Sequence, residues 1–251
     1  MVWGLVRRDL QARYAGSALG MVWTFLHPLL LLSVYLVAFS WILGVRFTTG
    51  GGSGNFALYL LAGLLPWLAF QEGVIKAAAA VVENAGLVKG VCFPAAVLVA
   101  SSVLASIVNL LISLGVFLLV LMLTGHLSWS GLPFLPLLAC LQVALAFGLG
   151  LFAAGLYTFL RDIMPVLQVG FMAWFYLTPI IYPLSYVPER LLPLFSYNPI
   201  TPLVTAYRAV LLEGAIPSEA SLVLACAWTV VVLLLGSLIF TRVEPGFADV
   251  L

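Results

Sequence analysis

The sequence predicts an all-α integral membrane protein with six transmembrane helices, an N-terminal interface helix and a re-entrant outer segment between the fifth and sixth spans. Composition is the first reason, because 64% of the 251 residues are hydrophobic and only 8% are charged, too few to cover a soluble globule. Apolar runs long enough to cross a bilayer recur along the chain. Residues 184–217 are still apolar, but prolines interrupt them too often for a helix of spanning length.

The first unit, residues 1–20, predicts a helix that lies in the membrane interface. Apolar side chains such as Trp3 recur at helical spacing, while Arg7 and Arg8 fall on the other side. Arg13 adds a further positive charge. The alternative is that these arginines only set the orientation of the first span.

The predicted spans differ in their polar content and in how closely they can pack. They cover residues 22–44, 56–82, 95–124, 133–160, 163–183 and 221–241. Pro66 is expected to kink the second span, where Glu72 and Lys76 are four residues apart and can pair on one helix face. Gly148 and its neighbouring glycines in the fourth span allow another helix to approach closely.

The distribution of basic residues favours cytoplasmic termini. Six spans place both termini on one side, and with that side inside, only Arg46, Arg190 and Arg208 of the 10 Lys and Arg residues lie outside. Cytoplasmic segments of membrane proteins carry an excess of Lys and Arg. The re-entrant segment is therefore expected on the outer face.

Signals for catalysis, metal binding and nucleic-acid binding are weak. His27 and His126 are predicted on opposite sides of the membrane with no Asp/Glu pair beside either, which disfavours a membrane-embedded glycosyl- or acyltransferase. Cys92, Cys140 and Cys226 are isolated, and no basic run could neutralise phosphates. The sequence lacks a G-x-x-x-x-G-K-[ST] phosphate loop. We expect no catalytic residue, no metal and no cofactor of its own.

Four blocks of sequence resemble, in the same order, the permease subunits of bacterial ABC polysaccharide exporters, the branch that moves O-antigen, capsule or teichoic acid chains. The blocks are RRDLQARYAGSALGMVW at 7–23, ENAGLVK at 83–89 followed by FP, RDI at 161–163 with YLTPIIYP at 176–183, and NPI at 198–200 with YR at 207–208. The resemblance implies a homodimeric pore in the cytoplasmic membrane, two separate ATPase subunits that bind ATP and Mg, and a lipid-linked polysaccharide as substrate. An ABC exporter of drugs or small lipids remains the alternative.

The resemblance also implies where the ATPase docks. In that family the loop between the second and third spans is a coupling helix, and the turn after the fourth span is a further cytoplasmic contact. The residues predicted to couple in this way are Glu83, Asn84, Gly86, Leu87, Lys89, Arg161 and Asp162. One departure from the family pattern is Gly90, which follows Lys89 where a second basic residue is frequent.

Aromatic residues near the outer face are candidates for a substrate path, because the C–H faces of sugars stack on aromatic rings. They are Trp174, Phe175, Tyr176, Tyr182, Tyr186 and Tyr197. An interfacial aromatic belt is the alternative for each.

The re-entrant segment is expected to form an outer gate. Pro199 and Pro202 divide it into short helices, and Arg208 and Glu213 are expected as outer charges that bind anionic groups or lie solvated at a rim. Cysteines at Leu194 and Leu203 are expected to react from outside.

Overall fold

The structure, a computed structural model, describes residues 2–12, 22–42, 56–90 and 93–251, and all the regular structure in these ranges is helical. Arg13 lies outside the described residues, as do Arg46, Cys92 and the end of the predicted first span.

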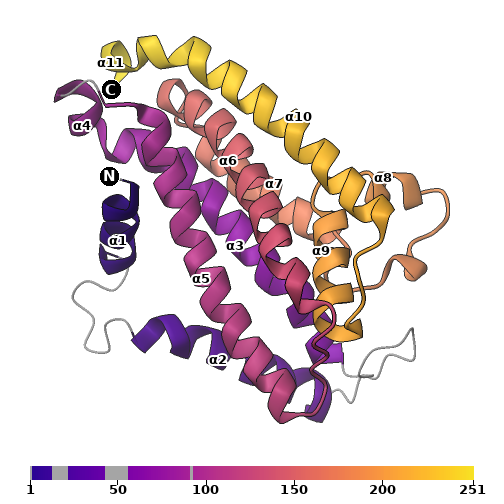
Figure 1. Ribbon diagram of the computed structural model, residues 1–251. Coiled ribbons are helices and arrows are strands. Elements are labelled where there is room, and N and C mark those ends of the chain that lie inside the picture. Colours follow the sequence, from indigo (N-terminus) through magenta and orange to yellow (C-terminus); the bar gives the residue numbers. More distant parts are fainter. Residues whose placement is uncertain (1, 13–21, 43–55, 91–92) are drawn as a thin grey trace.

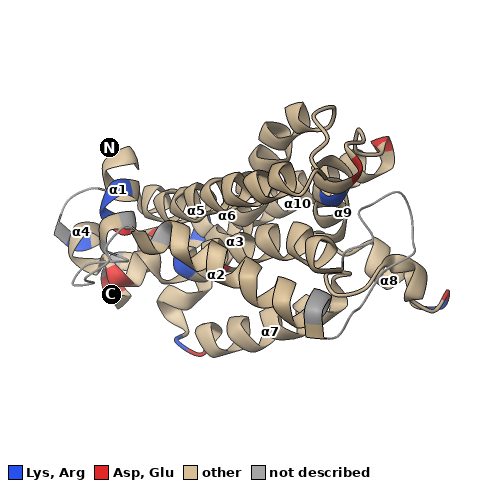
Figure 2. Ribbon diagram, turned by 90° about the horizontal axis from the view of Figure 1, so that it is seen from below, with Lys and Arg blue, Asp and Glu red and all other residues tan. Residues whose placement is uncertain are grey.

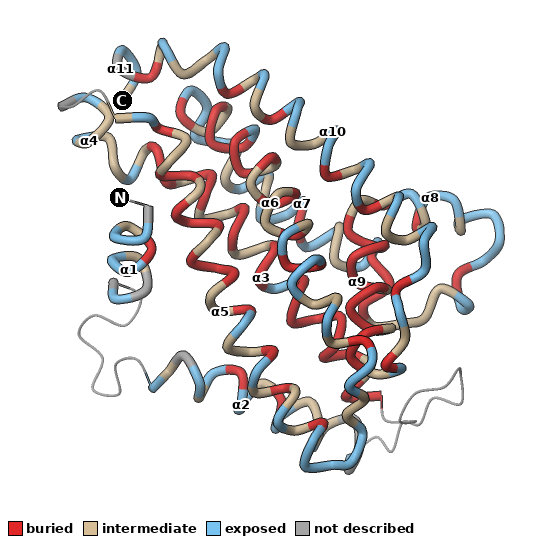
Figure 3. Tube along the Cα trace, in the orientation of Figure 1, coloured by how far each residue is buried: buried red, intermediate tan, exposed pale blue. Residues whose placement is uncertain are grey.

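Four long helices run side by side and form the body of the molecule (Figure 1). They are α3 (Phe56–Glu83), α5 (Ala95–Leu123), α6 (Leu135–Phe159) and α10 (Glu219–Val243). Each is long and apolar enough to cross a membrane, so the structure has four candidate spanning helices at positions where the sequence predicted spans. Of the four, α3 is the most deeply buried and α10 the least, as Figure 3 shows.

Two predicted spans correspond to shorter α-helices. The first is α2 (Trp23–Leu36), which continues as a π-helix over Val37–Ile42 and lies obliquely to the long helices in Figure 1. The other is α7 (Ile163–Leu177). The prediction extended this helix to residue 183, but Thr178 precedes a proline and is extended, with φ −104° and ψ 135°. A residue before proline is disfavoured in the α conformation, which explains the early end of the helix.

Short helices lie at one end of the bundle, together with both described chain ends (Figure 1). The N-terminal helix α1 (Val2–Ala12) packs on α5, with Val6 fully buried and Trp3 and Arg7 exposed, so its predicted amphipathic character is confirmed. Helix α4 (Ala85–Gly90) connects α3 to the chain before α5, and α11 (Phe247–Val250) closes the chain. We call this end of the molecule the α4 end.

The predicted outer segment lies at the opposite end. It contains α8 (Leu192–Ser196) and α9 (Thr201–Arg208), and α9 continues as a π-helix over Ala209–Glu213. Helix α9 contacts α3, α6 and α10, and Leu203 is fully buried, so the expected accessibility of Leu203 is wrong. Leu194 in α8 is 60% exposed, as expected. We call this end the α9 end.

Charged residues gather at these two ends, and most of the bundle between them carries none (Figure 2). This is the distribution that a bilayer imposes, since its hydrocarbon core cannot solvate charge.

Helices α6 and α10 cross with their backbones in close contact. A Cβ atom added to Gly236 would lie 1.9 Å from the carbonyl oxygen of Gly148, and one added to Gly148 would lie 2.6 Å from Cα of Leu233. Only glycine allows the two backbones to come this close. The predicted packing role of Gly148 is therefore confirmed.

Replacing Gly236 with alanine should force α6 and α10 apart. We expect a loss of about 1–3 kcal/mol in folding free energy, seen as a lower unfolding temperature of the purified protein in detergent. Gly115→Ala in α5 is the matched control, because its Cβ would meet no described atom within 4 Å. Equal stability of the two variants would contradict the close crossing.

Candidate functional site

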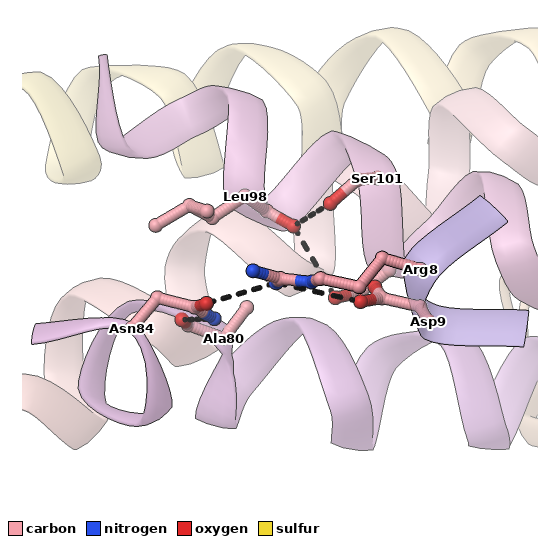
Figure 4. A network of polar contacts seen from close by, with 7 residues as sticks. Arg8, Asp9, Ala80, Asn84, Leu98 and Ser101 are labelled. Carbon is pink, nitrogen blue, oxygen red and sulfur yellow. Dashed lines mark hydrogen bonds and ion pairs between the residues drawn. The ribbon is translucent and has the colours of Figure 1, made fainter. Parts of the chain in front are cut away.

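Asn84 connects two segments with predicted functional residues at the α4 end, the N-terminal helix and the predicted coupling helix. Its Nδ2 donates to the carbonyl oxygen of Ala80 at 2.8 Å, in the last turn of α3. Its Oδ1 accepts a hydrogen bond of 2.9 Å from Arg8 Nη2, and Arg8 also lies 3.6 Å from the Asp9 carboxylate (Figure 4). Arg8 thus joins the N-terminal helix directly to the start of the predicted coupling helix.

The predicted coupling helix presents much of its surface away from the bundle. Glu83, Gly86 and Lys89 are exposed and Leu87 is half-buried. A Cβ at Gly86 would contact nothing within 4 Å in the described part of the chain. The segment therefore has room to contact another protein.

The turn between α6 and α7 holds the remaining predicted coupling residues, Arg161 and Asp162, and both are exposed. The Arg161 guanidinium carbon lies 5.2 Å from the centre of the Tyr157 ring. An arginine over an aromatic face is stabilised by cation–π attraction, which orients this side chain.

Sequence reasoning missed the C-terminal residues that join these segments. The Phe247 ring is buried, 5.9 Å from the Phe159 ring and 5.4 Å from the Phe240 ring. Glu244 Oε1 accepts a 3.2 Å hydrogen bond from the backbone N–H of Ala95. That N–H belongs to the first turn of α5, where helix geometry leaves donors without partners. A carboxylate and an aromatic ring just after the last span were the only signals in the sequence.

Arg208 lies inside the α9 end and is not a solvated rim charge. Only 6% of the residue is exposed. Its Nη1 donates to the Tyr59 hydroxyl at 2.8 Å, and its Nε donates to the Tyr59 carbonyl oxygen at 3.2 Å. Nη1 and Nη2 also donate to the carbonyl oxygens of Pro179 and Ile180, each at 2.5 Å. The prediction of an outer-surface charge fails because backbone carbonyls, which leave no signal in a sequence, solvate the guanidinium.

Gly63 makes room for this guanidinium. A Cβ at Gly63 would lie 2.7 Å from Arg208 Nη2. Arg208 therefore joins α9 both to α3 and to the chain that follows α7.

Asn198 forms a second polar junction at the same end. Its Nδ2 donates to the Leu177 carbonyl oxygen and to the Thr178 hydroxyl, both at 3.0 Å. Its Oδ1 accepts from the Trp174 indole N–H at 2.8 Å and from the Ile200 backbone N–H at 3.2 Å. One buried amide thus closes the end of α7 against the start of α9.

The predicted path aromatics fall into two groups. Trp174 and Phe175 pack on Trp67, with ring centres 5.9 Å apart in both pairs, and Tyr182 donates to the Tyr176 carbonyl oxygen. Tyr176, Tyr186 and Tyr197 are exposed.

Two of the predicted path residues line an open hollow of about 650 Å³. Trp174 and Tyr197 line it together with Arg190 and Trp228. Of the predicted gate residues, Pro202 is buried, Pro199 is half-buried and Glu213 is exposed. Within the described ranges, no three His, Cys, Asp or Glu side chains come together as metal ligands would.

Comparison with known proteins places this arrangement in a family. Residues 1–212 match the family described as ABC-2 type transporter. The chain belongs to this ABC-2 family. It is similar to the O-antigen export system permease protein RfbA of Myxococcus xanthus, with 32% identity over 98% of this chain and 93% of the relative. RfbA of Klebsiella pneumoniae is 29% identical over the same shares, and the polysialic acid transport protein KpsM of Escherichia coli is 24% identical over 96% of this chain and 92% of its own.

Arg208→Met should destabilise this ABC-2 protein by about 3 kcal/mol or more, because it removes charge-assisted bonds and leaves buried carbonyls unpaired. Arg208→Lys should be only partly tolerated, since an ammonium lacks the planar fork that reaches several acceptors. The measurement is the unfolding temperature of the purified protein. Arg190→Met, at an exposed position, is the control and should change it little. A stable Arg208→Met protein would refute the structural role.

Proposed function

We propose that this chain is the membrane subunit of an ATP-driven ABC exporter that moves a lipid-linked polysaccharide, of the O-antigen, capsule or teichoic acid type, across the bacterial cytoplasmic membrane. The observation that carries the proposal is the match to an O-antigen export permease over 98% of the chain. Membership in the ABC-2 type transporter family supports it.

The proposed assembly contains two copies of this chain and two ABC ATPase subunits. The sequence has no G-x-x-x-x-G-K-[ST] phosphate loop, so ATP hydrolysis is assigned to the ATPase subunits. A single copy offers too few helices to enclose a path for a polymer, which is the reason for a homodimer.

We further propose six crossings with cytoplasmic termini. Besides the four long helices, α2 has 14 residues and continues as a π-helix of six, and α7 has 15 residues. Helix α7 would cover about 22 Å, so the non-helical chain that follows Leu177 would complete its crossing. Both described chain ends lie at the α4 end, in keeping with an even number of crossings (Figure 1). The excess of basic residues expected on the cytoplasmic side gives the orientation.

Coupling is proposed to run through the exposed α4 segment. Gly86→Asp combined with Leu87→Asp should leave the permease folded but separate ATP turnover from export, because new charges disrupt an apolar contact. The measurement is polysaccharide exported per ATP hydrolysed by the complex in proteoliposomes. Ser185→Asp, exposed at the other end, is the control. An unchanged ratio in the double variant would remove α4 from the coupling path.

The outer gate is proposed to involve the exposed side of α8. A cysteine at Leu194 should react with a membrane-impermeant thiol reagent from outside, whereas one at the buried Leu203 should not react in the folded protein. Labelling is compared in right-side-out and inside-out vesicles. Reaction of Leu194→Cys from the cytoplasmic side alone would refute both the orientation and the gate.

The substrate class is tested in proteoliposomes that contain the permease and its ATPase. Release of a lipid-linked polysaccharide into the lumen, dependent on ATP, is the expected result. Transport of small lipids or drugs without polysaccharide would favour the alternative exporter.

A further inference from the structure

A polar cavity opens at the α4 end, where α1, α2, α3 and α5 contribute to its lining. Its volume is about 940 Å³, and we call it the polar vestibule. Its charged lining residues are Arg8, Asp9, Glu72, Lys76 and Glu83. The whole chain holds only 10 basic and 9 acidic residues, so one cavity collects about a quarter of them. Such a concentration in an apolar bundle indicates a site for a polar ligand.

The vestibule reaches far into the bundle. Glu83 is the last residue of α3, and Glu72 lies eleven residues earlier in the same helix. At 1.5 Å per residue these two residues are about 16 Å apart along the axis, roughly half of the hydrocarbon core. A recess of about 60 Å³ shares His27 and Glu72 with the vestibule and is also lined by Asn109. A much smaller recess thus adjoins the vestibule at the depth of Glu72.

The described lining residues carry charges of both signs, with one more carboxylate than cations. Lys76 Nζ lies 2.8 Å from Glu72 Oε1, which confirms the pair predicted from their spacing. Asn109 Nδ2 lies 3.5 Å from the same oxygen. Arg8 contacts Asp9 and the Asn84 amide. Among the described lining residues, two cations face three carboxylates, so these residues offer no surplus of positive charge.

Such a lining suits hydroxyl groups better than anions. A hydroxyl both donates and accepts, so it can bond to carboxylates, amides and ammonium groups alike. A sulfate, phosphate or carboxylate can only accept, and it would lie beside three carboxylates that repel it. Charge complementarity therefore distinguishes a neutral glycan from a polyanionic one.

We propose that the polar vestibule binds the hydroxyl groups of an uncharged glycan and that its charge balance selects against polyanionic chains. The proposal rests on the proposed export function and goes further, since it names the substrate class and the residues that select it. Family membership leaves the choice between neutral and anionic polysaccharides open.

A protection experiment on the full-length permease, assembled with its ATPase in nanodiscs, tests the site. The native cysteines are replaced, and a single reporter, Ile75→Cys, is placed in the lining. An uncharged maleimide then measures the labelling rate with neutral dextran oligosaccharides or with dextran sulfate of the same length. We expect dextran to slow labelling about fivefold or more and dextran sulfate to slow it less than about twofold.

Asp249→Cys provides the position control, because this residue is exposed in α11 and is not among the lining residues of the vestibule. Neither polymer should change its labelling rate. Leu68→Cys is a second reporter in the lining, at an exposed position, and should behave like Ile75→Cys.

A separate variant tests whether the charges of the lining select against polyanionic chains. Asp9→Asn together with Glu83→Gln, in the Ile75→Cys protein, leaves two cations facing one carboxylate in the lining. Dextran sulfate should then slow labelling about fivefold, against less than about twofold in the Ile75→Cys protein with its native carboxylates. Unchanged discrimination in this variant would overturn the proposed selection.

The remaining outcomes separate this proposal from the function on which it rests. If both polymers protect the reporter equally, the vestibule proposal is overturned. It is also overturned if neither polymer protects the reporter in a complex that exports polysaccharide. If the maleimide labels neither lining cysteine, the vestibule is not open to solutes and the proposal is overturned. Dextran protection in a complex that exports no polysaccharide supports the site and overturns the export function.

Discussion

The hydrogen bonds of Arg208 and Asn198 are the interactions on which the α9 end depends. A chain that leaves its helix inside a bilayer exposes carbonyl groups that lipid cannot satisfy. The turn after α7 has this problem, and Arg208 supplies donors to Pro179 and Ile180 while Asn198 supplies one to Leu177. Gly63 provides the necessary space on α3. The broken segment that contains α8 and α9 can therefore pack against the bundle as a fixed structure.

The polar contacts at the α4 end have a different role from those at the α9 end, because they join short surface elements to the long helices. Arg8 connects α1 to Asn84, and Glu244 connects the end of α10 to the start of α5. In the proposed exporter, a force applied to α4 by an ATPase would reach α1 through one side chain and α3 through the backbone. The polar vestibule lies between these elements, next to the proposed docking surface.

Hydropathy alone predicted the long helices well. The second, third and last spans were placed within a few residues of α3, α5 and α10, because long apolar runs have no other stable arrangement in a bilayer. The Glu72–Lys76 pair also followed from spacing. Arg208 could not be placed in this way, because its acceptors are backbone carbonyls up to 149 residues away. The sequence likewise named both Arg8 and Asn84 without any signal that they bond to each other.

The bond between Glu244 and Ala95 has a consequence for biosynthesis. The two residues are 149 positions apart, so α5 leaves the ribosome long before the carboxylate that caps its first turn has been translated. Until α10 has inserted, the first turn of α5 lacks this acceptor and Phe247 cannot yet pack on Phe159. The surface around α4 is thus completed late, so an ATPase subunit that recognised it would engage finished permeases and pass over nascent ones.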